Sequence, residues 1–533
     1  MIRFSSYLVA PLIFLLFWTA GCGSTEPLAE QPAPAEQPEQ AEEPGESIEI
    51  ILLQLNDVYE IDGVGGGAWG GLDRVAYLLK ELEQENPNTY AVIAGDLFSP
   101  SAMGTARVKQ PDGTSVRLDG EQMVSVLNAM GLDYATLGNH EFDLREGPFK
   151  ARLQESEFEW ITSNVTDPSG NLFAKTVPHK VINATTDAGT VRIGLVGALL
   201  MPGAESSNLA DCSRDFIEKY NITSTSSTPA YYTISNPIAA IQEQVWNLKG
   251  NVDILIALTH LALKEDIELS ETVDDLDLIL GGHEHENWQA WSRSTRAPIR
   301  KADANARTVY VHRLTYDTKT GALDITSQLK TITQSSSSDA SVAALIETWR
   351  ERAFAAFRAD GLNPKDTVYV ITEALDGHEA NVRNGSTNLT ELIADAMLNE
   401  APETELSLYN SGSIRIDDVI LPGAVTQYDV IRVLPFGGEL LDVEMKGDLL
   451  ECVLEQGDLN RGSGGFLQVK WRNGDPRRPL DPNRFYRVAV NDFLLTGNET
   501  GLSYLTSDAP DIQSQQTASD DLRQVLIKEM QRQ

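Results

Sequence analysis

Cysteine is scarce in this chain, because only Cys22, Cys212 and Cys452 occur among its 533 residues. This excludes a disulfide-rich scaffold, although a single bridge between Cys212 and Cys452 stays open. Basic residues are also few, since 42 Lys and Arg stand against 78 Asp and Glu, for a formal net charge of −36. So acidic a chain argues against a protein that binds nucleic-acid polymers.

Long apolar runs are missing after Trp18, so no later segment is predicted to span a membrane. The apolar run before Trp18 follows a basic start and ends at Thr19-Ala20-Gly21-Cys22, a pattern typical of an export signal. Small residues directly before a cysteine resemble the bacterial lipoprotein cleavage site, which implies a signal peptide at 1–22 and a lipid on Cys22. The alternative is an ordinary cleaved signal.

The composition divides the remaining chain into segments. Residues 23–47 are rich in Pro, Glu, Gln and Ala, which predicts a disordered spacer. Strand-like runs alternate with helical patterns over 48–335, which indicates an α/β domain. Residues 336–365 contain a serine run and one predicted connecting helix, and 366–533 form a second predicted domain.

Five apolar runs in the first domain stop at short polar clusters, and such runs are typical of buried strands. Ligands of open α/β sheets bind beyond the carboxyl ends of their strands, so we expect these clusters to meet at one edge. The clusters hold four of the seven histidines in the chain. They are Asn56-Asp57, Gly95-Asp96, Gly138-Asn139-His140-Glu141, His260 and Gly281-Gly282-His283-Glu284-His285.

Carboxylate, amide and imidazole groups at one edge are the ligands of a divalent metal site. Two such sites close together can clamp a phosphoryl group and activate water, provided that one carboxylate bridges the two ions. Asp96 is the best candidate for that bridge, because it follows a glycine at the tip of a strand.

The ordered set GD, GNHE, a lone strand-end histidine and GHEH resembles the calcineurin-like metallophosphoesterases. The second domain narrows the resemblance to the 5′-nucleotidase family, which includes UDP-sugar hydrolases and 2′,3′-cyclic phosphodiesterases. The resemblance implies an N-terminal four-layer α/β/β/α sandwich and a C-terminal α/β substrate-binding domain, joined by a linker helix.

The resemblance also implies a role for each residue of the motifs. Two divalent ions (Zn, Mn, Mg or Co) would generate a bound hydroxide as nucleophile. His140, held by Asp143, would stabilise charge or protonate the leaving oxygen. One ion would be bound by Asp57, Asp96 and His285, and the other by Asp96, Asn139, His260 and His283.

Tyr59 departs from the family pattern, which has histidine two residues after the first aspartate. A phenol with a reference pKa of about 10 ligates only as phenolate, and a ferric ion would favour that form. Alternatively Tyr59 points away, and water or Glu60 completes the ligand shell.

Residues of the second domain resemble the substrate site of the family. Arg415, in Asn410-Ser411-Gly412-Ser413-Ile414-Arg415, would grip a phosphate or carboxyl group as a fork. Phe436 and Phe493 would sandwich a base, whereas core packing is the alternative for both. The full implied substrate set is Arg383, Asn410, Arg415, Phe436, Phe493 and Glu499.

Three positions depart from this part of the pattern. Glu379 replaces an arginine, and Gly438 replaces an asparagine. Near the end, Gly497-Asn498-Glu499-Thr500-Gly501 replaces a Gly-Gly-Asp-Gly-Tyr run, with Glu499 in the acidic place. We expect an exported, monomeric, lipid-anchored enzyme, on the periplasmic or cell-surface side of a bacterial membrane, that hydrolyses nucleoside 5′-monophosphates. The departures leave two alternatives open: a hydrolase of sugar or cyclic nucleotides, and a catalytically decayed nucleotide-binding protein.

Overall fold

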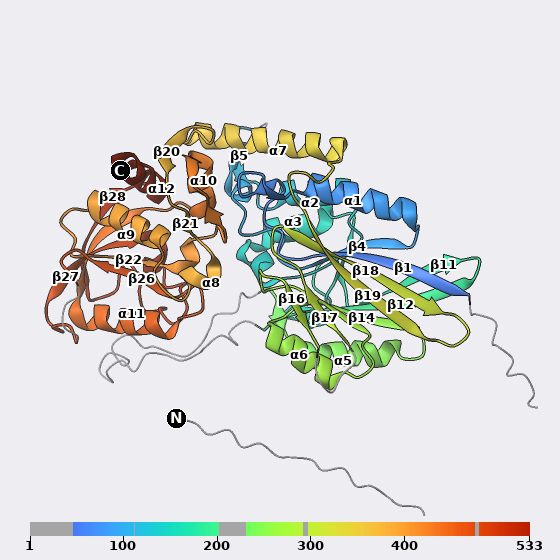
Figure 1. Cartoon of the computed structure of the whole chain (residues 1–533). Coiled ribbons are helices and arrows are strands. Elements are labelled where there is room, and N and C mark those ends of the chain that lie inside the picture. Colours follow the sequence, from blue (N-terminus) through green and yellow to red (C-terminus); the bar gives the residue numbers. More distant parts are fainter. Residues whose placement is uncertain (1–45, 111, 202–230, 292–296, 475–478) are drawn as a thin grey trace, which may run out of the picture. The chain divides into compact units, whose positions relative to one another are not determined.

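A computed structural model describes residues 46–110, 112–201, 231–291, 297–474 and 479–533 (Figure 1). The expected signal peptide, nearly all of the spacer, Cys22 and Cys212 lie outside these residues. In the described ranges, no helix has the length and apolar character that a membrane crossing requires.

A seven-stranded sheet carries the first three polar clusters. Its order is β10-β8-β7-β4-β1-β18-β19. The strands are β1 (Ser47–Leu55), β4 (Thr89–Ala94), β7 (Tyr134–Thr136), β8 (Glu159–Ile161), β10 (Thr176–Val177), β18 (Thr308–Asp317) and β19 (Leu323–Thr331). Strands β1, β4 and β7 are parallel neighbours, so their carboxyl ends lie at one edge of the sheet.

A six-stranded sheet carries the other two clusters, in the order β11-β12-β14-β15-β17-β16. The strands are β11 (His179–Thr186), β12 (Gly189–Leu199), β14 (Ile254–His260), β15 (Leu278–Gly281), β16 (Trp288–Ala290) and β17 (Ile299–Lys301). Strands β12, β14 and β15 run parallel, which brings the segments after β14 and β15 together.

The two sheets pack face to face, because one buried cluster draws side chains from both. It includes Ile50 and Leu52 of β1 together with Ile193 of β12 and Ile256 of β14. Alternate residues of β1, such as Ile51, belong instead to the cluster that contains the helices.

Helices cover the outer faces of both sheets. Figure 1 shows α1 (Leu72–Glu85) and α2 (Glu121–Met130) on one side of the strands, and α5 (Pro237–Leu248) and α6 (Leu263–Thr272) on the other. The expected α/β layering of the N-terminal domain is therefore confirmed.

Helix α7 (Ala340–Ala359) follows the two sheets. Asp339 caps it by accepting hydrogen bonds from the N–H groups of Ser341 and Val342. Its buried side chains include Val342, Ile346 and Trp349. The exact domain boundaries given by the sequence stay predictions.

The C-terminal part is built on a five-stranded sheet in the order β26-β22-β27-β25-β28. Its strands are β22 (Leu406–Asn410), β25 (Leu440–Lys446), β26 (Leu467–Trp471), β27 (Phe485–Asn491) and β28 (Ile512–Ser519). Figure 1 shows α9 (Asn388–Glu400) and α11 (Gly447–Leu459) on opposite faces of this sheet. The α/β class expected for the second domain is confirmed.

Shorter elements complete the described chain. The remaining helices are α3 (Glu146–Glu155), α8 (Glu379–Val382), α10 (Gln427–Val433), α12 (Leu522–Arg532), η1 (Met103–Thr105), η2 (Asn139–Asp143), η3 (Ser411–Ser413) and η4 (Asp492–Leu495). The remaining strands are β2 (Gly63–Val64), β3 (Trp69–Gly70), β5 (Arg107–Lys109), β6 (Ser115–Arg117), β9 (Val165–Thr166), β13 (Thr233–Ile234), β20 (Thr367–Ile371), β21 (Leu375–Asp376), β23 (Val419–Ile420) and β24 (Gly423–Thr426).

Candidate metal centre and substrate site

The loops after the strands adopt backbone conformations that non-glycine residues rarely take. Asp57, Asp96 and His283 have φ angles of 52°, 58° and 82°. Gly138 permits a close approach, because a Cβ atom there would lie 2.1 Å from Asp96 Oδ1. Three of the loops that carry the polar clusters thus each contain a non-glycine residue with positive φ.

One group of atoms converges around the Tyr59 hydroxyl. This hydroxyl donates a hydrogen bond to Asp96 Oδ2 at 2.9 Å and lies 3.0 Å from His285 Nε2. Asp57 Oδ1 lies 3.4 Å from the hydroxyl and 3.6 Å from His285 Nε2. Four side chains from three separate loops therefore surround one point.

A second group shares Asp96 with the first. His260 Nε2 lies 3.3 Å from Asp96 Oδ2 and 3.1 Å from Asn139 Oδ1. The ring of His283 stands edge-on to that of His260, with 5.4 Å between their centroids. Every residue that the sequence assigned to a metal is therefore found at this edge of the sheets.

The donor set fits a pair of divalent ions. Single ligand atoms of Asp57, Asp96 and His260 all lie within 4.8 Å of one another, and all three side chains are buried. Carboxylate oxygens and imidazole nitrogens are the usual ligands of Zn²⁺ and related ions. Asp96 belongs to both groups, as a bridging carboxylate must.

Charge coupling within the cluster shifts several pKa values. Burial lowers the pKa of His260, but the charge of Asp96 outweighs it and the resulting pKa is about 9. The pKa of His285 is likewise raised to about 10, against burial, by Glu379 and Asp417. Burial and the neighbouring His260 lower the pKa of His283, so its imidazole is neutral. A cation that binds here displaces protons from His260 and His285.

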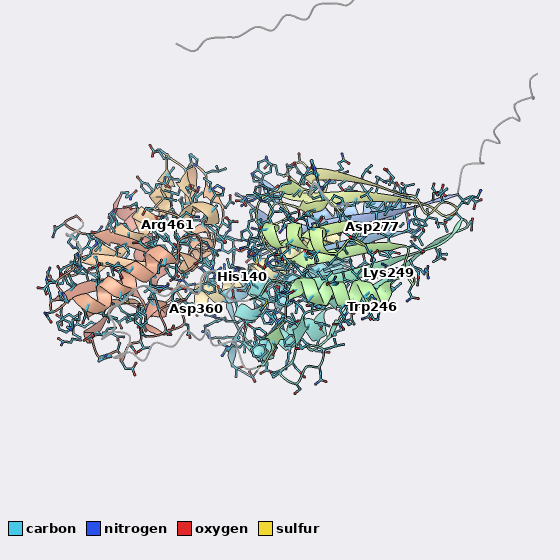
Figure 2. All side chains as sticks on the ribbon, turned by 90° about the horizontal axis from the view of Figure 1, so that it is seen from below. His140, Trp246, Lys249, Asp277, Asp360 and Arg461 are labelled. Atoms are coloured by element: carbon cyan, nitrogen blue, oxygen red, sulfur yellow. The ribbon has the colours of Figure 1, made fainter. Side chains whose placement is uncertain are left out.

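His140 stands beside the cluster, and its side chain is labelled in Figure 2. Its Nδ1 lies 2.8 Å from Asp143 Oδ2, and its backbone N–H donates to Asp96 Oδ1 at 2.9 Å. Figure 2 shows His140 in the N-terminal domain, well separated from Lys249 and Asp277. His140 belongs to η2, which follows β7, so it lies beyond the carboxyl end of that strand. Against burial, Asp143 and then Asp96 raise the pKa of His140.

Tyr59 does not point away from the cluster, as one alternative from the sequence supposed. Only 5% of its surface is exposed, and burial followed by the charge of Asp96 holds its phenol pKa well above the usual value. Glu60 is directed elsewhere, because its carboxylate accepts hydrogen bonds from the Ala102 N–H and the Tyr428 hydroxyl. The structure thus excludes Glu60 as the group that completes the cluster in this conformation.

One carboxylate in the motifs, that of Glu141, binds backbone N–H groups and does not face the cluster. Glu141 is fully buried and accepts hydrogen bonds from the N–H groups of Asp96, Leu97 and Gly138. Burial, and then the charge of Asp96, raise its pKa to about 7. In the sequence, only the place of Glu141 in the GNHE motif indicated that it belongs to the site, and the motif alone did not indicate its role.

Lys301 was missed by the sequence analysis. It is fully buried, and its Nζ donates to the carbonyl oxygens of Leu261 and Gly282, the residues next to His260 and His283. Glu284 and Asp266 neutralise it. No local pattern marks a lysine at the end of a short strand as part of such a site.

Asp417 was also missed, because it lies more than a hundred residues from its partner in the sequence. Its Oδ2 is 2.6 Å from His285 Nδ1, which leaves Nε2 of that ring facing the cluster. The Glu379 carboxylate lies 3.8 Å from the same nitrogen and is ion-paired with Arg383. Glu379, which replaces an arginine of the family pattern, therefore engages one expected substrate-binding residue.

Direct contacts join only some of the remaining residues that were expected to bind substrate. Phe436 and Phe493 are 41% and 39% exposed, so core packing does not explain them. Arg415 stacks over Phe436, with 5.6 Å from Cζ to the ring centroid, and its Nε has no hydrogen-bond partner in the described chain.

The other two expected substrate-binding residues are Asn410 and Glu499. Asn410 is buried and accepts hydrogen bonds from Ser413 and Asn491. Glu499 lies within electrostatic range of Arg415.

Three histidines outside the motifs have other partners. His179 lies 2.9 Å from Gln244 Oε1, and His378 is paired with Asp376. His312 is buried between Gln54 and Ser327. None of the three takes part in the cluster.

Comparison with known families agrees with this arrangement. Residues 51–287 match the calcineurin-like phosphoesterase family, and residues 367–472 match the 5′-nucleotidase C-terminal domain. The chain is therefore a metal-dependent phosphoester hydrolase, a class that implies divalent metal ions. It belongs to the 5′-nucleotidase family.

Individual relatives have low sequence identity to this chain but align over most of its length. The trifunctional nucleotide phosphoesterase YfkN of Bacillus subtilis is 26% identical over 80% of this chain, which spans only 31% of that protein. The 5′-nucleotidase of Bos taurus is 24% identical over 81% of this chain and 78% of its own. The crystal structure of a 5′-nucleotidase precursor from Thermus thermophilus has the same fold, with a TM-score of 0.70, 22% identity and coverage of 91% and 96%.

Proposed function

We propose that this protein hydrolyses nucleoside 5′-monophosphates and related nucleotides to nucleoside and phosphate outside the cytoplasm. The observation that carries the proposal is the sharing of Asp96 between two groups of ligand atoms, beside an imidazole that is not part of either group. The N-terminal sequence, with Cys22 after small residues, supports export and a lipid anchor.

Two divalent ions at the cluster would supply positive charge for the phosphoryl oxygens and lower the pKa of water. His140 would act at the phosphoryl group or the leaving oxygen through Nε2, because Asp143 occupies Nδ1. Asp143 fixes the ring and favours its protonated form, which suits a donor to a developing alkoxide.

Recognition of the substrate would come from the C-terminal domain. The Arg415 guanidinium can form a fork on phosphate oxygens, since no carboxylate of the described residues pairs with it. The exposed rings of Phe436 and Phe493 offer flat apolar faces for a base.

Glu379 supports a second candidate, the hydrolysis of sugar or cyclic nucleotides. It pairs with Arg383, so it neutralises an arginine that the family resemblance assigns to substrate binding. A catalytically decayed protein is disfavoured, because Asp57, Asp96 and His260 remain together.

Phosphate release from a nucleotide panel, measured with and without a chelator, tests the proposal. We expect nucleoside 5′-monophosphates to be hydrolysed and the chelator to abolish release until a divalent ion is restored. Higher kcat/KM for sugar or cyclic nucleotides supports the second candidate. Release that the chelator does not affect, or no release from any phosphoester, contradicts both.

A further inference from the structure

A cavity of about 410 Å³ is lined in part by Asp143, the residue that pairs with His140. Asp143 forms part of its wall and also contacts the His140 ring, so the cavity adjoins the proposed reaction centre. Its size falls within the range of small-ligand sites. Three arginines line it, namely Arg107, Arg117 and Arg145.

Two of these arginines face each other across a hairpin. Arg107 of β5 pairs directly with Arg117 of β6 in antiparallel register. Side chains in such pairs share one face, with Cβ atoms about 4.5–5.5 Å apart, and like charges there repel. Arg145, just before α3, brings a third positive charge to the same cavity.

Carboxylates offset the charge of this cluster only in part, because Asp119 lies within electrostatic range of all three arginines but forms no ion pair with them. No ion pair joins the three arginines to an acidic side chain within the described ranges, although the chain has 78 acidic residues to 42 basic ones. Arg117 Nε is buried without a hydrogen-bond partner there. Asp143, the nearest wall carboxylate to His140, is already paired with that ring, and Asp119 is the other acid in the wall.

The pKa of Arg117 reflects both its burial and the repulsion among the arginines. Burial, and then the charge of Arg107, lower its pKa, while Asp119 partly offsets the effect. An unpaired, partly desolvated guanidinium beside other cations is stabilised when an anion binds. A phosphoryl group matches the fork of an arginine in geometry and charge.

We propose that the cavity lined by Arg107, Arg117 and Arg145 is a subsite for a second phosphoryl group of the substrate. This inference rests on the proposed function, because it assumes that the scissile phosphoryl group lies at the candidate metal centre. It names the preferred substrates as nucleotides with two phosphoryl groups, such as nucleoside diphosphates or bisphosphates. Asp143 both lines the cavity and contacts His140. A phosphoryl group in the cavity is therefore more easily explained as part of the bound substrate than as a separate anion.

The test compares the metal-loaded wild-type enzyme with an Arg107→Gln/Arg117→Gln double variant. Substrates are a nucleoside 5′-monophosphate, its 5′-diphosphate and its 3′,5′-bisphosphate. We expect KM for at least one doubly phosphorylated substrate to rise about tenfold or more, and KM for the monophosphate to change by less than about twofold. Lys109→Gln is the matched control, because Lys109 lies on β5 but does not line the cavity.

Inhibition by inorganic phosphate separates the two sources of a bound anion. Weaker phosphate inhibition in the double variant with no change in any KM would assign the cavity to a free anion and overturn the proposal. Equal changes for all three substrates, or none, would also overturn it. If no substrate is hydrolysed by the wild-type enzyme, the proposed function fails instead, and with it the premise of a scissile group at the metal centre.

Folding of the variants is checked by thermal unfolding. Removal of a like-charge pair is not expected to lower Tm. Should the double variant nevertheless unfold, Arg145→Gln changes the same cavity from a different segment, and the same selective rise in KM is expected. Its absence in a folded Arg145→Gln protein contradicts the proposal.

Discussion

The Tyr59 hydroxyl donates a hydrogen bond to Asp96 Oδ2 at 2.9 Å and so stands inside the candidate metal centre, 3.0 Å from His285 Nε2. A phenol in that position takes the place where the family pattern has an imidazole. It keeps its proton unless a strongly charged cation displaces it, because burial and Asp96 raise its pKa.

Tyr59→Phe tests whether this phenol becomes a ligand. If Tyr59 ligates a ferric ion as phenolate, metal-loaded wild-type protein shows a visible charge-transfer band and the variant lacks it. Absorption spectra with metal analysis of the same samples provide the measurement. Tyr59→His is the matched control, since it restores the family ligand and is expected to be colourless and active. A colourless wild-type enzyme with full activity would rule the phenolate out.

Asp143→Asn tests the role assigned to the His140 pair. The variant is expected to lower kcat by about 10²–10⁴-fold, the usual range for loss of general acid–base catalysis. Because Asp143 raises the pKa of His140, its removal also moves the limb of the pH profile that reports protonated His140 to lower pH. The metal content is expected to stay unchanged. An unshifted profile with normal kcat contradicts the role.

Asp417→Asn tests how His285 is held. Groups that orient a metal-bound histidine typically contribute 10- to 100-fold in metal affinity. We therefore expect the variant to bind one metal ion about tenfold or more weakly, measured by competition with a chromogenic chelator. Asp418→Asn is a neighbouring control, because Asp418 faces Arg307 and Arg432 instead. Equal affinities in the Asp417 variant and wild type would leave Asp417 without a positioning role.

His312 provides a test of stability against pH. Burial, and then the charge of Arg300, lower its pKa to about 3 in the folded protein. The unfolded chain has an ordinary histidine pKa of about 6.5, so it binds the proton first as pH falls. The contribution of neutral His312 to the free energy of unfolding is therefore fully present above pH 6.5 and is lost progressively as the pH falls toward 3.

In His312→Gln this contribution disappears. The free energy of unfolding of wild type, measured by denaturant titration, is expected to fall relative to the variant by up to about 1.4 kcal/mol per pH unit below pH 6.5. His378→Gln serves as a control, because its ring is partly exposed and pairs locally with Asp376. Parallel curves for wild type and His312→Gln contradict this account.

Much of the fold follows from local sequence, and the α/β class expected for both domains is confirmed. Apolar runs such as the one before Asn56-Asp57 become buried parallel strands, because only buried strands need continuous apolar side chains. The motifs also indicated which side chains would meet at the strand ends. Their assignment to particular ions stays a prediction.

Long-range pairings could not be predicted from the sequence. Asp417 approaches His285 only through the tertiary fold, and nothing near Asp417 in the sequence marks it. The facing of Arg107 and Arg117 depends on the register of a hairpin, and a shift of one residue would separate them. The pair of Glu379 and Arg383, by contrast, is local, because the two residues are four positions apart on helix α8 and its end.

Metal content per chain tests the central claim most directly. We expect wild-type protein to bind two metal ions per chain by elemental analysis, and Asp96→Asn to retain at most one and lose activity. Asp376→Asn, a change of the same kind at a surface carboxylate paired with His378, is expected to keep two ions. One ion or none in active wild-type protein, or two ions in Asp96→Asn, would contradict a centre that shares Asp96.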